Sequence, residues 1–373
     1  MAADVPGTES DWLIVGGGVV GLSVAWGLVL RGQRVTVVDG PDRDHRASRG
    51  NFGLVWVQGK GVDAPHYARW TRRSVAAWRG FADDLEHASG EALSLEQRGG
   101  LDIHFDDASL GVAEANYQRL RAELDGDYPY ERLDASALRR IEPEIGPEVC
   151  GALFHPEDGQ VNPLRLLGAL ASAVQRNGGH LHSDCAIERI DADGGGFVAV
   201  DADGRRFSAG RIALCAGLGA IRLGPQLGFA VPIQPLRGQV LITERMPPVV
   251  GYPSVIARQV DNGGIQLGDS KEPVGFDDGT TLDICATIAA RAIRAYPALA
   301  KARMLRSWGA LRVMSPDGLP IYQQSSRYPG AFFLTCHSGI TLAAGHARFL
   351  SEWLDDASAL PDLAAFSEAR FDV

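Results

Sequence analysis

The alternation of apolar and polar positions near the N-terminus predicts a repeating strand and helix pattern. Residues 12–15 are a short apolar run, typical of a buried strand. The glycine-rich residues 16–21 follow, and residues 22–30 continue with the Ala, Val and Leu of a helix. A second strand is predicted over residues 34–39. Strand, turn, helix and strand within about 30 residues predict a βαβ unit.

The remaining chain continues with both periodicities. Apolar positions three to four apart predict an amphipathic helix over residues 67–85. Further helices are predicted over residues 108–124, from Asn162 onward, over 282–296 and over 339–354. Strands are predicted over residues 101–105, 211–215, 239–243, 265–267 and 332–335, with a hairpin of 197–200 and 206–208 around Asp203-Gly204.

The order of these elements predicts an α/β protein with two interleaved domains, because strand-helix units occupy both ends and strands dominate the middle. The first domain is a doubly wound, nucleotide-binding layer. Its predicted segments are residues 1–85, 146–225 and 305–373. The second is a substrate domain built from residues 86–145 and 226–304.

The spacing of Gly16, Gly18 and Gly21 fits a dinucleotide fingerprint. Gly16 makes the tight turn, Gly18 lets backbone N–H groups reach a pyrophosphate, and Gly21 lets helix and strand pack closely. Asp39 ends the second predicted strand and can accept hydrogen bonds from ribose hydroxyls, which argues against NADP. The unit does not distinguish FAD from NAD, and a glycine-rich turn that binds nothing remains the alternative.

Charge and composition narrow the range of partners. The 373 residues include 36 Lys+Arg against 46 Asp+Glu, and the net charge of −10 disfavours a nucleic-acid partner. Five widely spaced cysteines without a C-x-x-C predict a reduced, cytoplasmic protein. The apolar residues 19–30 are too few to span a membrane, so no integral membrane segment is expected. His180 and His182 lack a third ligand, so no metal site is predicted.

Several segments together resemble one known family. They are residues 47–54 (Ala-Ser-Arg-Gly-Asn-Phe-Gly-Leu), 158–163, 212–217, 308–312 (Trp-Gly-Ala-Leu-Arg) and 337–341 (His-Ser-Gly-Ile-Thr). With the βαβ unit, they resemble the D-amino-acid oxidase-like flavoenzymes over about residues 11–354. The resemblance implies a Rossmann-like FAD-binding domain interleaved with an antiparallel-sheet substrate domain, the glutathione-reductase-type flavoprotein architecture.

The resemblance also implies a set of residues that contact FAD. They are Gly16, Gly18, Val19, Val20, Gly21, Asp39, Ser48, Arg49, Asn51, Phe52, Gly53, Cys185, Ala186, Ala216, Gly217, Ser338, Gly339, Ile340 and Thr341. Sarcosine oxidases attach their flavin through a cysteine after the conserved Arg, where this chain has Val313, Met314 and Ser315. The FAD is therefore expected to be noncovalent. Residues 158–163 are interpreted as scaffold, a turn followed by a helix N-cap.

The expected reaction follows from the same resemblance. In the family, the Arg at the position of Arg312 binds the substrate carboxylate, and a guanidinium suits a carboxylate because it binds it in a bidentate manner. A surface Arg paired with an acid is the alternative. Several oxidases place a Tyr on a middle strand where this chain has residues 256–259, so the nearest candidate is Tyr252. His337 and His66 are candidates to assist.

The expected substrates are primary or secondary amines: D-amino acids, hydroxyproline, glycine or sarcosine, and opines. A hydride would leave the carbon bearing nitrogen for flavin N5, and the imine would then hydrolyse. Residues 59–61, 237–239 and 336–343 most resemble the FAD subunits of bacterial amine dehydrogenases, which commonly work in hetero-oligomers. One alternative is a flavin-carrying structural or electron-transfer subunit without its own substrate site. Another is an NAD-dependent dehydrogenase.

Overall fold

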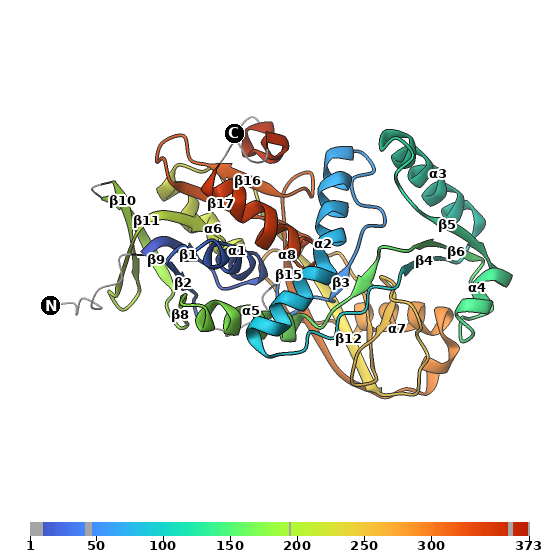
Figure 1. Ribbon diagram of the computed structural model, residues 1–373. Helices are drawn as coiled ribbons and strands as arrows, with labels where there is room; N and C mark the ends of the chain where they lie inside the picture. Colours follow the sequence, from blue (N-terminus) through green and yellow to red (C-terminus); the bar gives the residue numbers. More distant parts are fainter. Residues whose placement is uncertain (1–9, 42–46, 194, 357–360, 372–373) are drawn as a thin grey trace.

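The computed structural model describes residues 10–41, 47–193, 195–356 and 361–371. The molecule is elongated, with a large sheet and its covering helices towards one end and two smaller sheets towards the other (Figure 1). The fold class is confirmed. It is a mixed α/β fold with a parallel sheet core and separate antiparallel sheets.

The predicted βαβ unit forms the centre of the large sheet. β1 (Ser10–Val15) pairs in parallel with β2 (Val35–Val38), and α1 (Val19–Leu30) connects them. β1 also pairs in parallel with β11 (Arg206–Leu214). Central strands are covered on both faces, which explains why residues 12–15 form an uninterrupted apolar run.

The rest of the large sheet extends from this unit. Its order is β16-β17-β11-β1-β2-β8, and β9 and β10 continue as antiparallel strands from β11. The added strands are β8 (His180–His182), β9 (Ile187–Asp193), β10 (Gly196–Asp201), β16 (Ile321–Gln324) and β17 (Ala331–Thr335). The hairpin at Gly204 is confirmed.

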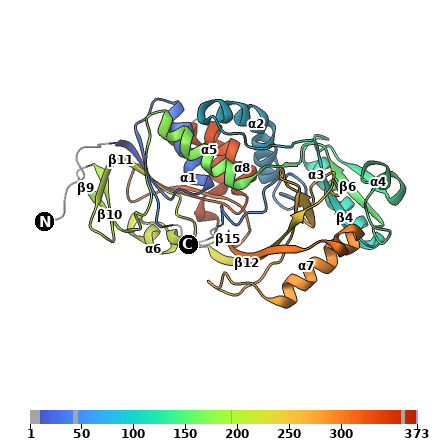
Figure 2. The ribbon, with the colours of Figure 1, turned by 90° about the horizontal axis from the view of Figure 1, so that it is seen from below.

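Four helices cover one region of this sheet. α1 is almost wholly buried and packs against α5 (Pro163–Arg176) and α8 (Gly339–Gly345), which Figure 2 shows together, and α2 (Pro65–Ser89) packs on α5 and α8 in turn. α2 presents its apolar stripe inward and ends at Gly90 in the left-handed conformation. Asn162 caps α5, because its side-chain oxygen accepts hydrogen bonds from the Leu164 and Arg165 amides.

Two antiparallel sheets form the other end. The four-stranded sheet has the order β13 (Ala257–Gln259), β14 (Gly264–Leu267), β12 (Gln234–Arg245), β15 (Met304–Met314). The three-stranded sheet has the order β4 (Gly100–His104), β6 (Gly151–His155), β5 (Glu131–Asp134). α7 (Leu282–Ala295), α3 (Asp107–Glu123) and α4 (Ala135–Ile141) pack beside them. One apolar core, including Leu101, Leu241 and Ile288, joins both sheets.

Short elements complete the described chain. A two-stranded pair joins β3 (Leu54–Val55) to β7 (Gly159–Gln160). The remaining helical segments are Gly217–Gly219, α6 (Ala220–Leu223), Gly224–Leu227, Pro297–Lys301, Pro361–Phe366 and Glu368–Phe371. Within these described ranges, no helix is both long enough and apolar enough to cross a membrane. The domain boundaries given above remain a prediction.

Two elements differ from the expectation. The sequence predicts separate strands over residues 206–208 and 211–215, but β11 runs without a break from Arg206 to Leu214, because Gly210 stays extended and continues the ladder. The predicted helix over 339–354 contains a π-helical turn, His346–Leu350, between α8 and α9 (Ser351–Asp355). Its first residue, His346, is buried and its Nε2 lies 2.8 Å from the Tyr322 hydroxyl.

Candidate functional site

The glycine turn after β1 is packed so closely that side chains have no room. Gly16 has a φ of +115°, and a β-carbon there would lie 2.4 Å from the Cys215 carbonyl oxygen. A β-carbon at Gly21 would lie 2.0 Å from the Gly16 carbonyl oxygen. The turn, α1 and the end of β11 are therefore held together through their backbones, as the fingerprint requires.

The N-terminus of α1 faces the segment that begins at Ser48. The Val19 amide donates a 3.0 Å hydrogen bond to Ser48 Oγ. The N-cap residue is Gly18, which has no side chain that could cap the helix. A β-carbon at Gly18 would lie 3.1 Å from the same hydroxyl. Val20 is the second residue of α1, so it also lies at this helix N-terminus. A twelve-residue helix with a glycine cap presents backbone N–H groups and the positive end of its dipole to an anion.

The carboxyl ends of the neighbouring strands complete this edge. Asp39 follows β2, and its carboxylate lies against the glycine turn, 3.1 Å from where a β-carbon of Gly17 would be. The Asp39 carbonyl accepts a 2.8 Å hydrogen bond from the Cys185 amide, which brings residues 185–186 to the same edge; Ala186 follows directly. Ala216 and Gly217 follow β11 beside them. Ligands of open α/β sheets bind along this edge.

Residues 47–54 run between the large sheet and the four-stranded sheet. Asn51 Oδ1 accepts a 2.7 Å hydrogen bond from the Gly53 amide, and Gly53 has a φ of +89°. The indole N–H of Trp308 donates to the Gly50 carbonyl at 3.1 Å. The Phe52 ring lies so close to Gly268 that a β-carbon there would approach it to 2.9 Å. Arg49 lines a pocket of about 440 Å³ with Asn51 and Trp308.

The start of α8 lies beside the start of α1. A β-carbon at Gly339 would come within 2.7 Å of Val19 Cγ1, so glycine permits this approach. Ser338 precedes α8 and makes no side-chain capping bond to it. The Thr341 hydroxyl accepts from the Trp56 amide at 3.2 Å, and the neighbouring Ile340 is buried. Segments far apart in sequence thus meet beside the glycine turn.

Arg312 on β15 is mostly buried. Its Nη1 donates to the Ser270 carbonyl at 2.7 Å, and its Nη2 forms a 3.1 Å ion pair with Asp269. Burial lowers the pKa of Arg312, while the charges of Asp269 and Glu272 oppose that shift. It is therefore neither a solvated surface arginine nor a free one, and an incoming carboxylate would have to compete with Asp269.

His337 lies near Arg312. Burial lowers the pKa of His337 to about 3, and the charges of Lys60, Arg312 and Lys271 add to the effect. Its ring is therefore neutral at physiological pH, and its buried Nδ1 has no hydrogen-bond partner among the described residues. Arg312 therefore lies close enough for its charge to act on the His337 ring, although no hydrogen bond joins the two side chains among the described residues.

The structure does not connect Tyr252 or His66 to this pair through any contact of the described residues. The Tyr252 ring packs against Phe154 at 5.5 Å, and its amide donates to Glu142. His66 packs on Phe366 with ring centroids 5.2 Å apart, and burial lowers its pKa. Their proposed assistance in catalysis remains a prediction.

Two cations of this region are not among the expected site residues. Lys60 donates from Nζ to Ser338 Oγ at 2.7 Å, and Tyr67 donates to the same oxygen at 2.9 Å. Arg258 is 2 % exposed, lies under Gly53 and donates from Nε to Gln266 at 2.8 Å. Burial lowers the pKa of Arg258 to about 9. The Gly-Lys-Gly at residues 59–61 is the only signal for Lys60 in the sequence.

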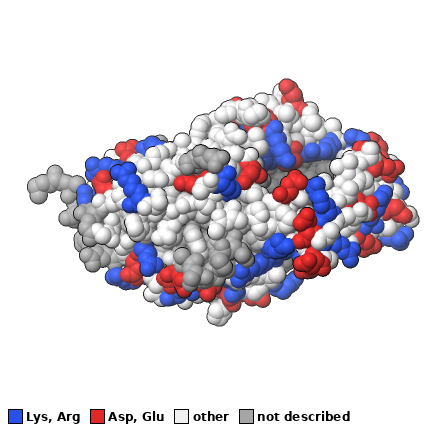
Figure 3. All heavy atoms as spheres, turned by 90° about the horizontal axis from the view of Figure 1, so that it is seen from above, with Lys and Arg blue, Asp and Glu red and all other residues white. Residues whose placement is uncertain are grey.

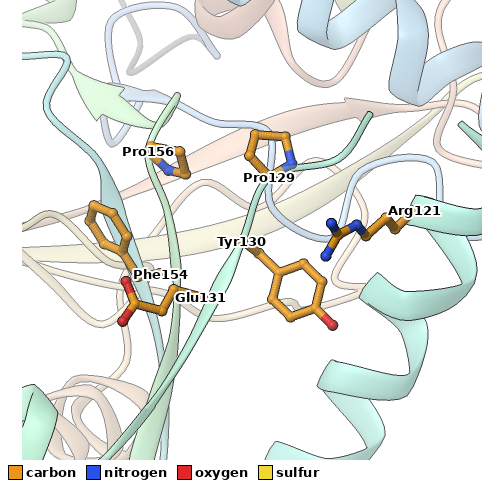
Figure 4. Close-up of a pocket in the computed structure, with 6 residues that line it drawn as sticks. All are labelled: Arg121, Pro129, Tyr130, Glu131, Phe154 and Pro156. Atoms are coloured by element: carbon orange, nitrogen blue, oxygen red, sulfur yellow. The ribbon is translucent and has the colours of Figure 1, made fainter. Parts of the chain in front are cut away.

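A separate pocket of about 410 Å³ lies beside α3 and β6 (Figure 4). Its lining residues are Arg121, Pro129, Tyr130, Glu131, Phe154 and Pro156. None of them is a predicted cofactor or substrate residue. On the face drawn in Figure 3, acidic and basic side chains are intermixed. The candidate site is therefore the edge of the large sheet at the glycine turn.

The residues at this edge fit the expected dinucleotide. β-carbons at the glycines of the turn would come into close contact with neighbouring atoms. The first amides of α1 lie beside Ser48, and Asp39 lies at the position where a ribose would be bound. These features accommodate a pyrophosphate and an adenosine ribose. The segments 47–54 and 338–341 then lie where the remainder of such a molecule would extend.

Comparisons with known proteins agree with this geometry. The sequence model of a family described as FAD dependent oxidoreductase matches residues 11–353. The chain is 41 % identical to one of the subunits of opine oxidase from Agrobacterium tumefaciens (strain Ach5), over 97 % of this chain and 98 % of that protein. It is 29 % identical to hydrogen cyanide synthase subunit HcnC of Pseudomonas aeruginosa, over 97 % and 96 %. The crystal structure of glycine oxidase from Geobacillus kaustophilus superimposes with a TM-score of 0.90 at 23 % identity, covering 97 % and 98 % of the two chains.

Proposed function

The chain belongs to the FAD dependent oxidoreductase family, and from this premise we propose that it oxidises the amine of an amino acid or a related compound. The relatives support this substrate class, since they include an opine oxidase subunit and a glycine oxidase. Candidate substrates are D-amino acids, hydroxyproline, glycine or sarcosine, and opines. When bound, noncovalent FAD supplies the acceptor for the hydride that leaves the carbon bearing nitrogen.

The observation that carries the proposal is the position of Arg312. Its partly buried guanidinium lies near His337, which directly precedes the residues that lie beside the glycine turn. In the proposed reaction, Arg312 exchanges its contact with Asp269 for the substrate carboxylate and so orients the amine-bearing carbon. The neutral His337 has a buried ring nitrogen, Nδ1, that no described residue engages. Water then hydrolyses the released imine.

A second proposal concerns assembly. The relatives at 41 % and 29 % identity are named as subunits. We propose that this chain also works in a hetero-oligomer, in a reduced cytoplasmic environment in keeping with its five free cysteines. A purely structural or electron-transferring subunit is the competing function, and it predicts that Arg312 is dispensable for turnover.

The test is an amine screen with the FAD-loaded protein and an artificial electron acceptor, with and without oxygen. We expect turnover of at least one amino-acid amine. We expect Arg312→Met to reduce its kcat/KM by about 100-fold, because a charge-assisted hydrogen-bond pair is lost. Arg312→Lys should recover part of that loss, and all variants should retain FAD. Unchanged turnover in Arg312→Met would favour the structural-subunit function.

A further inference from the structure

The carboxylate of Asp269 lies between two arginines. Its Oδ2 is 3.1 Å from Nη2 of Arg312 on β15, and its Oδ1 is 3.6 Å from Nη2 of Arg291 on α7. Each oxygen of this carboxylate therefore faces a different guanidinium. Asp269 links the arginine that we propose to bind the substrate carboxylate with a second arginine from another element.

Arg291 has a buried N–H group that is not used. Its Nη2 donates to the Asp269 carbonyl at 2.8 Å and also to the Gly268 carbonyl, so the guanidinium is held against the chain that carries Asp269. Its Nε is buried and has no hydrogen-bond partner among the described residues. Nε and Nη2 lie on the side of a guanidinium that suits a carboxylate. Arg291 therefore has a donor to spare beside Asp269.

The other acidic side chain of this segment is already engaged. Glu272 accepts hydrogen bonds from Arg237 at 2.7 Å, from the Ser270 hydroxyl at 2.6 Å and from the Gln239 side chain at 3.1 Å. Among the described residues, Asp269 is the only acid within 4.0 Å of Arg312 or of Arg291. The two arginines therefore share one counter-ion.

The backbone around Asp269 is fixed, whereas its side chain has a second position to adopt. Arg312 holds the Ser270 carbonyl at 2.7 Å, and Arg291 holds the two carbonyls before it. Oδ1 needs to move by only about 1 Å to reach the usual distance of a charge-assisted hydrogen bond to Arg291. A rotation of the Asp269 side chain thus suffices, and no loop has to move.

We propose that Asp269 gates Arg312: it pairs with this arginine before the substrate binds, and it turns to Arg291 when a substrate carboxylate arrives. This inference rests on the proposed function, in which Arg312 binds that carboxylate, and it names the regulation of the same site. Two carboxylates beside one guanidinium repel each other, so the arriving one displaces the resident one. Arg291 then takes the displaced charge, and its Nε gains a partner.

The gate makes the site select for carboxylates. Arg312 belongs to a cation cluster around His337, formed with Lys60 and Lys271, and their charges lower the pKa of that ring. Such a cluster attracts any anion, but only a group that pairs with a guanidinium replaces Asp269 on Arg312. An amine without a carboxylate does not repel Asp269, so it finds Arg312 occupied.

The first experiment measures equilibrium binding of butyrate to the FAD-loaded protein by calorimetry. We expect Asp269→Asn to strengthen binding by about tenfold, because the competing charge is removed. Arg291→Met should weaken binding by about tenfold, because the displaced carboxylate loses its second cation. In the double variant, binding should match that of Asp269→Asn within about threefold. Arg294→Met, which breaks an exposed ion pair with Glu148 on the same helix, is the matched control and should bind butyrate normally.

Two results would overturn the gate. Weaker butyrate binding in Asp269→Asn would mean that Asp269 holds Arg312 in place instead of competing for it. An equal loss from Arg291→Met with and without Asp269 would mean that Arg291 acts on the ligand through its charge alone. Chemical denaturation and FAD content check the fold of each variant, and Asp269→Ser provides the same comparison if Asp269→Asn does not fold.

The second experiment uses the amino acid that is turned over fastest in the amine screen. Asp269→Asn should lower its KM by about tenfold and change kcat by less than about threefold, because the gate acts on binding and not on the reacting carbon. A lower kcat with unchanged KM would contradict the gate.

Failure of the gate and failure of the proposed function give different results. If Arg312→Met abolishes butyrate binding but Asp269→Asn and Arg291→Met do not alter it, the gate is wrong and the role of Arg312 stands. If Arg312→Met leaves butyrate binding unchanged, Arg312 does not bind the carboxylate, and the gate fails with it. If butyrate binding follows the expected cycle but no amine is oxidised, the gate stands and the proposed oxidation fails.

Discussion

The glycine turn and the cation cluster around His337 lie in one molecule but are built by opposite means. At the turn, the absence of side chains at Gly16 and Gly21 lets neighbouring backbone segments approach closely. At the cluster, long charged side chains arrive from segments far apart, and Lys60 and Ser338 are 278 positions apart. The first region depends on steric fit, and the second on charge, so mutations should affect different properties.

The largest effect is expected at the turn. Gly21→Ala places a methyl group 2.0 Å from the Gly16 carbonyl oxygen, and backbone cannot yield as a flexible side chain can. We expect a loss of at least about 3 kcal/mol in the free energy of unfolding, together with loss of FAD. Chemical denaturation and flavin content measure the two effects.

The matched control for this substitution is Gly32→Ala. Gly32 has a φ of +77°, but no atom of the described residues lies within 4 Å of its would-be β-carbon. It should cost about 1 kcal/mol through backbone strain alone and should leave FAD bound. Similar losses in both variants would mean that steric contact does not distinguish the turn.

The same contrast explains what the sequence can predict. The turn is local: strand, glycines, helix and acid lie within residues 12–39, so spacing alone predicts the βαβ unit, and its pairing is confirmed. Lys60 lies between two glycines and looks like part of an exposed turn. The packing of α2 on α8 brings together the segments that precede these helices, and with them Lys60 and Ser338.

Other gaps have the same physical origin. The apolar spacing over residues 339–354 is compatible with a continuous helix, and it holds no signal for the π-helical turn at His346. Arg258 and Arg312 could each have been surface arginines, because a sequence does not reveal burial. Arg258 meets Gln266 because β13 pairs with β14, and Arg312 meets Asp269 because β12 pairs with both β15 and β14, which Asp269 follows.

The second prediction tests the charge-dependent region. Arg237 is buried and paired with Glu272, whose segment carries the residues that contact Arg312. Arg237→Met would leave Glu272 without its cation. We expect a loss of about 2 kcal/mol in unfolding free energy, a raised substrate KM and normal FAD content.

The control for this pair is Arg119→Met, which breaks an exposed ion pair with Asp63. Exposed pairs contribute little, so we expect a change below about 1 kcal/mol and unaltered kinetics. If Arg237→Met released FAD as readily as Gly21→Ala, the separation between the two regions would be wrong.

The third prediction concerns pH. Since the pKa of Lys60 lies at about 8, its charge is present below that value and is lost as pH rises through it. Binding of a carboxylate ligand beside Lys60 should therefore weaken as pH rises above 8, up to the loss caused by removing the charge, and Lys60→Arg should reduce this dependence. Calorimetry at several pH values measures it.

Neighbouring groups decide how that pH profile is assigned. Asp158, Cys336 and Lys271 act on Lys60, and the buried Cys336 thiol has a pKa of about 12, so it stays neutral in this range. Ionisation of Asp158 would weaken anion binding in the same direction. The pH dependence of binding that remains in Lys60→Arg is therefore caused by Asp158. Identical pH profiles in the wild-type protein and in Lys60→Arg would show that Lys60 does not bind the anion.

The smallest effect is expected at Asn162, which belongs to neither region. Its side chain accepts from the Leu164 and Arg165 amides, so its role is explained by capping α5. Asn162→Ala should cost about 1 kcal/mol of unfolding free energy, and Asn162→Asp should retain most of it because a carboxylate also caps. FAD content and kcat/KM should not change in either variant. A kinetic defect that Asp does not repair would show that Asn162 contributes to the pocket it lines with Arg49, and that a third region takes part in function.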